Sequence, residues 1–299
     1  MDVSTAIARF LDYLKFEKRY SAHSIQAYQH DLAQCSFFLQ QQFDVSTDVA
    51  EISTSMIRTW LAQLKDDGME ARTINRKLSA LKSWFRFMRR QQWLNTNPLA
   101  IINGPKVPRK LPSFANETEI DKLWNNIVYP DTWLGFTEKM ILELLYQTGM
   151  RRAELINLKE SQVDSGQRVL RILGKGNKER LIPVSPLLLA HLAQYMAEKR
   201  RQLETPDTTY VLVNEKGKKL TPHIVYRTVV KYLGEVSSLA KRSPHVLRHS
   251  FATHLANAGA DLNAIKELLG HSSLAATQIY THNSIEKLKD VHRQAHPKA

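Results

Sequence analysis

A histidine, an arginine, a second histidine and a tyrosine follow one another in the last sixty residues of the sequence. His245 and Arg248 are three residues apart, His271 follows in the triplet Leu-Gly-His, and Tyr280 comes nine residues later. An arginine can bind two phosphate oxygens through its planar guanidinium group and keeps its charge, and imidazoles can add hydrogen bonds. Side chains of these types could bind one phosphate together, and the tyrosine could attack it.

The chemistry of such an attack explains why cations would gather around the phosphate. In-line attack on a DNA phosphodiester builds negative charge on the non-bridging oxygens, and fixed cationic groups lower that barrier. A tyrosine hydroxyl, with a free pKa of about 10, is a poor nucleophile, but it can attack a neutralised phosphate as it loses its proton. The product would be a phosphotyrosine that stores the bond energy, so resealing the strand would need no ATP.

Two more candidates lie upstream. The apolar helical pattern that includes Met140 and Leu145 ends at Gly149, and Arg151 then stands at the start of the next predicted helix, where backbone N–H groups favour an anion. Lys175 lies in a Gly-Lys-Gly turn between two short strand patterns that together span residues 169–184. A lysine at such a hairpin tip can donate a proton to a leaving oxygen. Glu154 is a candidate partner that orients an arginine.

These residues carry a resemblance to a known family. The segments Thr-Gly-Met-Arg151, Gly174-Lys-Gly-Asn-Lys-Glu-Arg180, His245-x-x-Arg248-His, Leu-Gly-His271 and Tyr280 resemble, in order and spacing, those of the tyrosine recombinases, which are also called phage-integrase-like proteins. The similarity is greatest to the bacterial Xer recombinases and extends over nearly the whole chain.

The resemblance implies a role for each motif residue. Arg151 and Arg248 would clamp the scissile phosphate, and His245 and His271 would hydrogen-bond it. Lys175 would protonate the 5′-hydroxyl that leaves. The nucleophile Tyr280 would form a 3′-phosphotyrosyl bond. All of these positions hold the expected residue type, and the resemblance implies no cofactor and no metal.

Other functions remain open at this stage. His245 and His249 are four residues apart and could form a metal pair on a helix, although the glutamate that zinc proteases carry beside the first histidine is absent. A metal-dependent phosphoesterase would lose strand cleavage on addition of EDTA. A DNA-binding protein that kept the fold and lost the chemistry is a further alternative, as is a mobile-element integrase or invertase.

Charge favours a nucleic-acid partner. The chain has a formal net charge of +13, which indicates affinity for polyanions. Between residues 71 and 94 the sequence has no carboxylate, and apolar residues recur every three or four positions, from Ile74 to Met88. This pattern predicts a helix with one packed face and one basic face along a DNA groove. The predicted DNA contacts are Arg72, Arg76, Lys77, Lys82, Arg86, Arg89 and Arg90.

Helical and proline patterns divide the chain. Four helices are predicted over residues 3–18, 24–41, 54–65 and 72–92, and four of the eleven prolines fall between residues 98 and 112. We therefore predict a mainly α protein with an all-helical core-binding domain (1–97), an extended Pro-rich linker (98–112) and a catalytic domain (113–299). The catalytic domain is expected to be mostly helical, with a small antiparallel sheet over 169–184 and a further strand candidate at 210–214.

Further features bound the cellular context. The single cysteine, Cys35, lies on an apolar helical stripe, so we expect it to be buried. Charged residues interrupt the N-terminus early and no apolar stretch is long enough for a bilayer, so we expect a cytoplasmic protein at the nucleoid without membrane contact.

The predicted assembly is a clamp on duplex DNA. Two domains with a hinge could close around the helix, and the resemblance implies that four protomers act on one pair of recombination sites. Ile285, Leu288 and Val291 form an apolar ridge near the chain end, which could cover its own domain or dock on a neighbouring protomer. A paralogous second recombinase and an activating DNA translocase are implied only by analogy.

Overall fold

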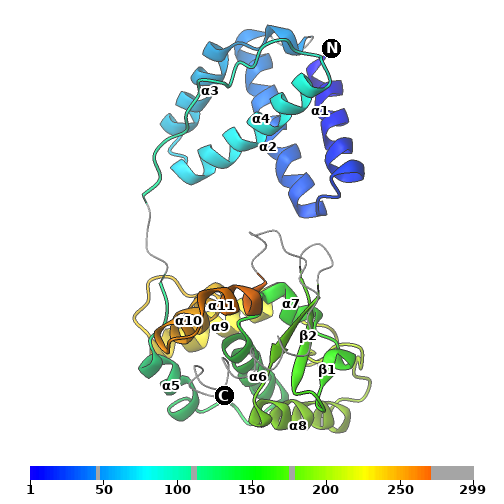
Figure 1. Cartoon of the computed structure of the whole chain (residues 1–299), viewed down its shortest axis with the longest axis vertical. Helices are drawn as coiled ribbons and strands as arrows, with labels where there is room; N and C mark the ends of the chain where they lie inside the picture. The colour runs from blue at the N-terminus through cyan, green and yellow to red at the C-terminus, as the bar shows by residue number, and fades with distance from the viewer. Residues whose placement is uncertain (45–47, 109–112, 175–178, 271–299) are drawn as a thin grey trace. The chain divides into compact units, whose positions relative to one another are not determined.

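The computed structural model describes residues 1–44, 48–108, 113–174 and 179–270, which are drawn in colour in Figure 1. The chain divides into two compact units between residues 110 and 111. Each unit has its own hydrophobic core.

Polar side chains cap the starts of the first three α-helices of the first unit. The Asp2 side chain accepts a hydrogen bond from the backbone N–H of Thr5, and Ser21 and Ser53 cap the second and third helices in the same way. The helices are α1 (Val3–Asp12), which continues into a π-helical turn η1 (Tyr13–Glu17), α2 (Ala22–Phe43), the short 3-10 helix η2 (Val49–Glu51), α3 (Thr54–Asp66) and α4 (Ala71–Arg90). The four predicted helices of this region are confirmed.

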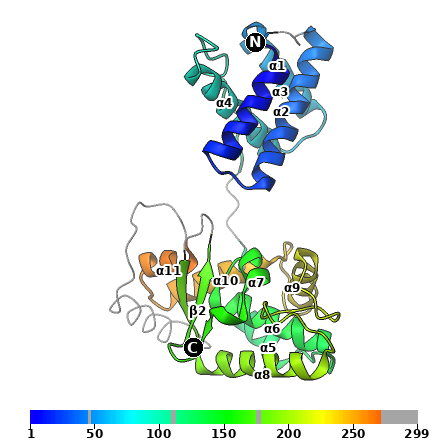
Figure 2. The ribbon, with the colours of Figure 1, turned by 90° about the vertical axis from the view of Figure 1, so that its right-hand side faces the viewer.

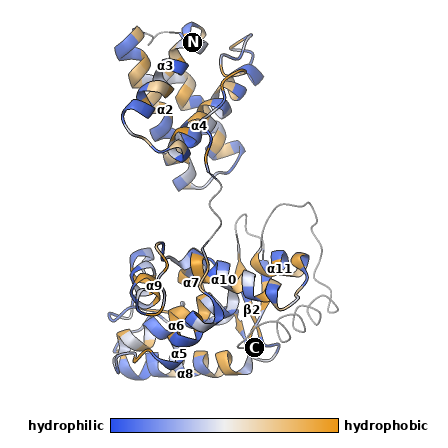
Figure 3. Ribbon diagram, turned by 90° about the vertical axis from the view of Figure 1, so that its left-hand side faces the viewer, coloured by the Kyte–Doolittle hydropathy of each residue, from blue (hydrophilic) through white to orange (hydrophobic). Residues whose placement is uncertain are grey.

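The core of this unit lies between α1, α2, α3 and α4. The predicted apolar stripe of α4 is buried from Ile74 to Met88, and hydrophobic and hydrophilic residues alternate along this helix in Figure 3. Cys35 is buried on α2, as expected, and burial raises the pKa of its thiol.

The start of the proline-rich segment packs onto the first unit. Leu99 and Ile102 are buried in its core. The backbone carbonyl of Pro98 accepts a hydrogen bond of 2.8 Å from the Thr54 hydroxyl, and that of Pro105 accepts one of the same length from the Asn75 amide. The segment that we predicted as an extended linker is therefore held by α3 and α4 up to Pro105, because its apolar residues supply part of the core.

The second unit combines helices with one small sheet. Its helices are α5 (Glu117–Asn125), α6 (Trp133–Thr148), α7 (Arg152–Asn157), the 3-10 helix η3 (Glu160–Gln162), α8 (Pro186–Gln202), α9 (Pro222–Val236), α10 (Pro244–Asn257) and α11 (Leu262–Leu269). Helix α6 is buried along almost its whole length, and α8, α9 and α10 pack around it. Helix α10 contacts both α9 and α11, and the three helices lie close together in Figure 1.

The sheet has three antiparallel strands in the order β1 (Val163–Asp164), β2 (Val169–Leu173) and β3 (Glu179–Pro183). Leu170 pairs with Ile182, and both are buried. Residues 210–214 do not form a strand; they make two isolated bridges, Lys159 with Tyr210 and Val213 with Lys219. Figure 2 shows α11 beside the hairpin of β2 and β3, and α11 contacts β3. The predicted fold class, mainly helical with a small antiparallel sheet, is confirmed.

Candidate active site

Arg151 is placed by a helix junction. Helix α6 ends at Gly149, which has a left-handed backbone with φ 58°. A Cβ atom there would come within 2.4 Å of the Phe251 ring on α10, so a glycine is required both for the turn and for the close packing. Arg151 then caps α7, its backbone N–H donating to Glu154 at 2.7 Å. A third of its side chain is exposed to solvent.

Arg248 and His245 come from the first turns of α10. The Arg248 side chain is buried, and its guanidinium donates to the carbonyl of Gly149 at 2.6 Å. His245, one turn earlier on the same helix, is exposed. The junction between α6 and α7 and the start of α10 therefore lie together, joined through Gly149.

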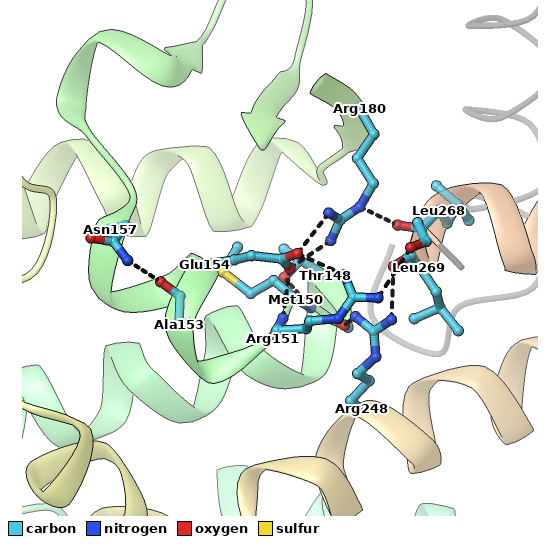
Figure 4. Close-up of polar contacts among 12 residues, drawn as sticks. Thr148, Met150, Arg151, Ala153, Glu154, Asn157, Arg180, Arg248, Leu268 and Leu269 are labelled. Atoms are coloured by element: carbon cyan, nitrogen blue, oxygen red, sulfur yellow. Dashed lines mark hydrogen bonds and ion pairs between the residues drawn. The ribbon is translucent and has the colours of Figure 1, made fainter. Parts of the chain in front are cut away.

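The end of α11 completes this pocket. The last carbonyls of a helix have no partner within it, and here they accept hydrogen bonds from arginines, as Figure 4 shows. Arg248 donates to the carbonyl of Leu269 at 2.7 Å, and Arg151 donates to that of Gly270 at 3.0 Å. Two arginines that the sequence places almost a hundred residues apart thus reach neighbouring carbonyls.

A third arginine, which the sequence analysis did not select, shares this arrangement. Arg180 on β3 is buried and donates to both carboxylate oxygens of Glu154, at 3.0 and 2.8 Å. Its Nε donates to the carbonyl of Leu268 at 2.7 Å. Glu154 also accepts from the Arg151 guanidinium at 2.8 Å, so its predicted role as a partner of an arginine is confirmed.

The cations of the pocket perturb one another. Burial and the charge of Arg151 lower the pKa of Arg248 to about 10, so Arg248 is still protonated at neutral pH. Desolvation by the surrounding protein and then the nearby charge of Arg248 lower the pKa of His245 below the ordinary value of a histidine. Burial acts to raise the pKa of Glu154, but the hydrogen bonds and charge of Arg180 outweigh it, so the net shift is downward. The Glu154 carboxylate is therefore surrounded by more positive charges than it can neutralise.

Half of the predicted catalytic residues cannot be placed. Lys175, His271 and Tyr280 lie outside the described residues, as does the apolar ridge of Ile285, Leu288 and Val291. Their chain neighbours are placed: β2 ends before the segment that contains Lys175 and β3 begins after it, and Gly270 directly precedes His271. The described chain thus brings Arg151, Arg248 and His245 together, and the other three residues remain predictions.

The basic face predicted on α4 needs one correction. Lys77 is buried, with 2 % of its surface exposed, and pairs with Asp31 at 3.2 Å and with Gln34, both on α2. A buried lysine of this kind cannot reach DNA, and it is tolerated because it has partners. The exposed members of the predicted set are Arg72, Arg76, Arg86, Arg89 and Arg90, and Lys82 is partly buried.

Four of these cations line a groove on the first unit. Lys82, Arg86, Arg89 and Arg90 surround a space of about 440 Å³ together with Asn97, Leu99 and Ala100. The Lys82 ammonium donates to the carbonyl of Ile102 at 2.7 Å, and Arg90 donates to the Tyr13 hydroxyl at 3.2 Å. The described structure gives Arg86 and Arg89 no such partner, which leaves them available to a polyanion.

Two alternatives from the sequence can be compared with the described residues. Within residues 1–44, 48–108, 113–174 and 179–270, no three His, Cys, Asp or Glu side chains are grouped so that they could hold a metal ion. No helix in the same ranges is long and apolar enough to cross a membrane.

Two family models match the chain. The model of the phage integrase family covers residues 114–287, and the model of the phage integrase N-terminal SAM-like domain covers residues 7–92. The two matches correspond to the second and the first structural unit.

Curated proteins align over nearly the full length. The tyrosine recombinase XerC of Bacillus pumilus is 37 % identical over 294 residues, covering 97 % of this chain and 95 % of the relative. That of Natranaerobius thermophilus is 38 % identical over 297 residues, covering 97 % and 98 %.

Solved structures of lower identity share the fold. A XerH site-specific recombinase in a post-cleavage complex with a palindromic difH substrate matches with a TM-score of 0.73 and 23 % identity, covering 95 % of this chain and 83 % of that one. A lambda integrase tetramer bound to a Holliday junction matches with a TM-score of 0.68 and 18 % identity, covering 94 % and 81 %.

Proposed function

This chain belongs to the phage integrase family and is a tyrosine site-specific recombinase, and from this premise we propose that it breaks and rejoins duplex DNA through Tyr280. The observation that carries the proposal is the convergence of Arg151 and Arg248 on adjacent carbonyls at the end of α11. Two guanidinium groups held this closely suit one phosphate, whose non-bridging oxygens would replace the carbonyls as acceptors.

Each residue has a part in the proposed step. Arg151 and Arg248 bind the non-bridging oxygens, and His245 and His271 add hydrogen bonds. The Tyr280 hydroxyl gives up its proton to water as its oxygen attacks phosphorus, and the 3′-phosphotyrosyl bond forms while the bond to the 5′-oxygen breaks. Lys175 gives that oxygen a proton. The same groups work in reverse when a 5′-hydroxyl attacks the phosphotyrosine, so no external energy source is needed.

The partners we propose are those of a recombination complex. The first unit binds duplex DNA through the exposed arginines of α4, and four protomers act on two recombination sites. The similarity to XerC relatives supports a role in chromosome-dimer resolution at cell division, in the cytoplasm at the nucleoid. A paralogous recombinase and a DNA translocase are further proposed partners.

Trapping on nicked duplexes tests this function. A library of duplexes with variable sequence is nicked close to each scissile position, so that the short strand released with its 5′-hydroxyl diffuses away and the covalent intermediate accumulates. The protein should form an adduct that resists denaturation, and sequencing the attached DNA would report the target. Tyr280→Phe should bind the recovered duplex but form no adduct.

A second tyrosine provides the control. Tyr226 is exposed on α9, and Tyr226→Phe should form the adduct at the wild-type rate. An adduct that persists in Tyr280→Phe would place the nucleophile elsewhere. Cleavage that stops when EDTA is added would instead favour the metal-dependent phosphoesterase.

A further inference from the structure

We propose that Arg180 is a positioning residue for the cleavage step, which it serves by sharing the charge of Glu154 and so leaving Arg151 free to act on the phosphate. The inference rests on the proposed function. Arg180 is 4 % exposed, so it does not contact DNA itself. It acts through two neighbours, the carboxylate of Glu154 and the carbonyl of Leu268.

The hydrogen bonds at Glu154 hold the Arg151 side chain in place. Oε1 accepts from Arg151 at 2.8 Å and from Arg180 at 3.0 Å, while Oε2 accepts from the Arg151 backbone at 2.7 Å and from Arg180 at 2.8 Å. Both oxygens are therefore shared between the two arginines. A carboxylate held on two sides fixes the Arg151 side chain in one orientation.

Arg180 also sets the net charge of the group formed by Glu154 and its two arginines. One carboxylate lies between two guanidinium groups, so this group keeps a net positive charge, to which Arg248 adds its own. Without Arg180, Glu154 would pair with Arg151 alone, and that pair would be neutral. The field at the phosphate would then come mainly from Arg248, and the negative charge that develops during attack would be less stabilised.

Arg180 also contacts the end of α11. Arg180, Arg248 and Arg151 donate to the consecutive carbonyls of Leu268, Leu269 and Gly270. Arg248 and Arg151 would have to turn from these carbonyls to bind a phosphate, whereas the buried Arg180 can keep its bond. Arg180 would thus hold the end of α11, immediately before His271, while the other two arginines exchange partners.

The test compares cleavage of the recovered nicked duplex by wild type, Arg180→Met, Arg180→Lys and Glu154→Gln under single-turnover conditions. Loss of a residue that orients a metal ligand typically lowers activity by about 10- to 100-fold, and we expect a loss of the same order for Arg180→Met, with nearly unchanged DNA affinity. Arg180→Lys should lie between, because an ammonium keeps the charge without the fork. Arg171→Met is the matched control, since Arg171 is an exposed arginine on the neighbouring strand β2, and it should cleave like wild type.

Two further measurements separate this role from general support of the fold. In the double variant Glu154→Gln with Arg180→Met, the surplus carboxylate is gone, so cleavage should be faster than in Arg180→Met alone. A duplex with a methylphosphonate at the scissile position carries no charge there, so the defect of Arg180→Met should shrink on it. A variant that is merely misfolded would be equally slow on both duplexes.

The outcomes are distinct. If wild type forms no adduct, the proposed function fails. If wild type forms the adduct and Arg180→Met cleaves as fast as wild type, the role of Arg180 is refuted and the proposed function stands. The same holds if the rate loss of the double variant equals the product of the two single losses and the defect of Arg180→Met is equally large on the methylphosphonate duplex. Should Arg180→Met fail to fold, as judged by circular dichroism, Arg180→Lys and the two duplexes decide the question in the same way.

Discussion

At the scale of single residues, the sequence identified side chains by chemical type but not by their partners. Arg151 and Arg248 could be predicted to share a phosphate because the family motifs fix their roles. Arg180 lies inside a quoted motif, yet nothing in the sequence indicates that its side chain reaches Glu154, which is 26 positions away. Alternation along β3 could have predicted that Arg180 points inward, where a buried arginine requires a partner.

His245 provides a prediction on pH. In the free protein, desolvation by the surrounding protein and the charges of Arg248 and other cations hold its pKa below the ordinary value of a histidine. A bound phosphate brings negative charge to the same place and should raise that pKa. DNA binding near pH 6.5 should therefore take up protons, and binding should strengthen as the pH falls towards 6.

Calorimetry in buffers of different ionisation enthalpy measures this uptake. His245→Asn should reduce it, while His223→Asn, which changes an exposed histidine of α9, should leave it unchanged. Equal uptake in all three proteins would show that His245 does not face the bound phosphate.

At the scale of elements, helix positions were predictable and the partners of their polar faces were not. The helical patterns of the sequence predicted α2, α3 and α4 to within a few residues. The sequence pattern predicted that all seven cations between residues 72 and 90 lie on one DNA-binding face of α4, yet Lys77 is buried against Asp31 of α2. A basic residue on a helix does not reveal whether a carboxylate lies opposite, because that depends on how the helices pack. For the same reason, Leu99 and Ile102 could not be foreseen as core residues.

Two cations of α4 should therefore behave differently. Arg86→Gln should weaken DNA binding and reduce the slope of log affinity against log salt by about 1, as expected for one lost phosphate contact. Lys77→Met removes one of the two cations paired with the buried Asp31, and because Arg76 remains as a partner, the loss of stability should be smaller than the roughly 3–5 kcal/mol of a fully broken buried pair. Once folded, this variant should keep the wild-type salt slope.

Urea unfolding and titrations at several salt concentrations check both parts. A salt slope that falls in Lys77→Met but not in Arg86→Gln would reverse the assignment and restore Lys77 to the DNA-binding face.

The contact between α6 and α10 makes stability depend on pH. His254 on α10 is buried, and its Nδ1 lies 3.1 Å from the Tyr146 hydroxyl on α6. Burial lowers the pKa of His254 despite the opposing effects of Glu117 and Asp121. The unfolded chain therefore binds a proton at this histidine more readily than the folded chain does. The contribution of neutral His254 to the free energy of unfolding is fully present above pH 6.5 and is lost as the pH falls below it.

The free energy of unfolding measured in urea between pH 7.5 and pH 5.5 tests this contribution. His254→Gln should be less stable at pH 7.5 and should depend less on pH over the same range. A variant with the wild-type pH dependence would assign the effect to other groups.

At the scale of the whole molecule, the division into two units and the net charge of +13 fit a protein that binds duplex DNA. The sequence predicted two domains because prolines interrupt the helical patterns, and each unit has a core of its own. The proposed assembly of protomers involves the apolar ridge of the tail, which lies outside the described residues.

The tail carries a prediction at this scale. Removal of residues from Ile285 onward should abolish cooperative assembly on DNA while a single protomer still binds, because the apolar ridge of Ile285, Leu288 and Val291 would no longer reach a neighbour. Gel-shift titrations measure this directly, and replacing the three ridge residues by serine should have the same effect. Cooperativity that survives both changes would mean that the ridge covers its own domain.

We propose that Arg151, Arg248 and Tyr280 act on one phosphorus atom. The most direct measurement is to digest the adduct trapped on a nicked duplex and to identify, by mass spectrometry, the amino acid that carries the nucleotide. We expect a 3′-phosphotyrosine at Tyr280, formed in the presence of EDTA and greatly reduced in Arg151→Met and Arg248→Met. A nucleotide on any other residue, or an adduct that both variants form at the wild-type rate, would contradict it.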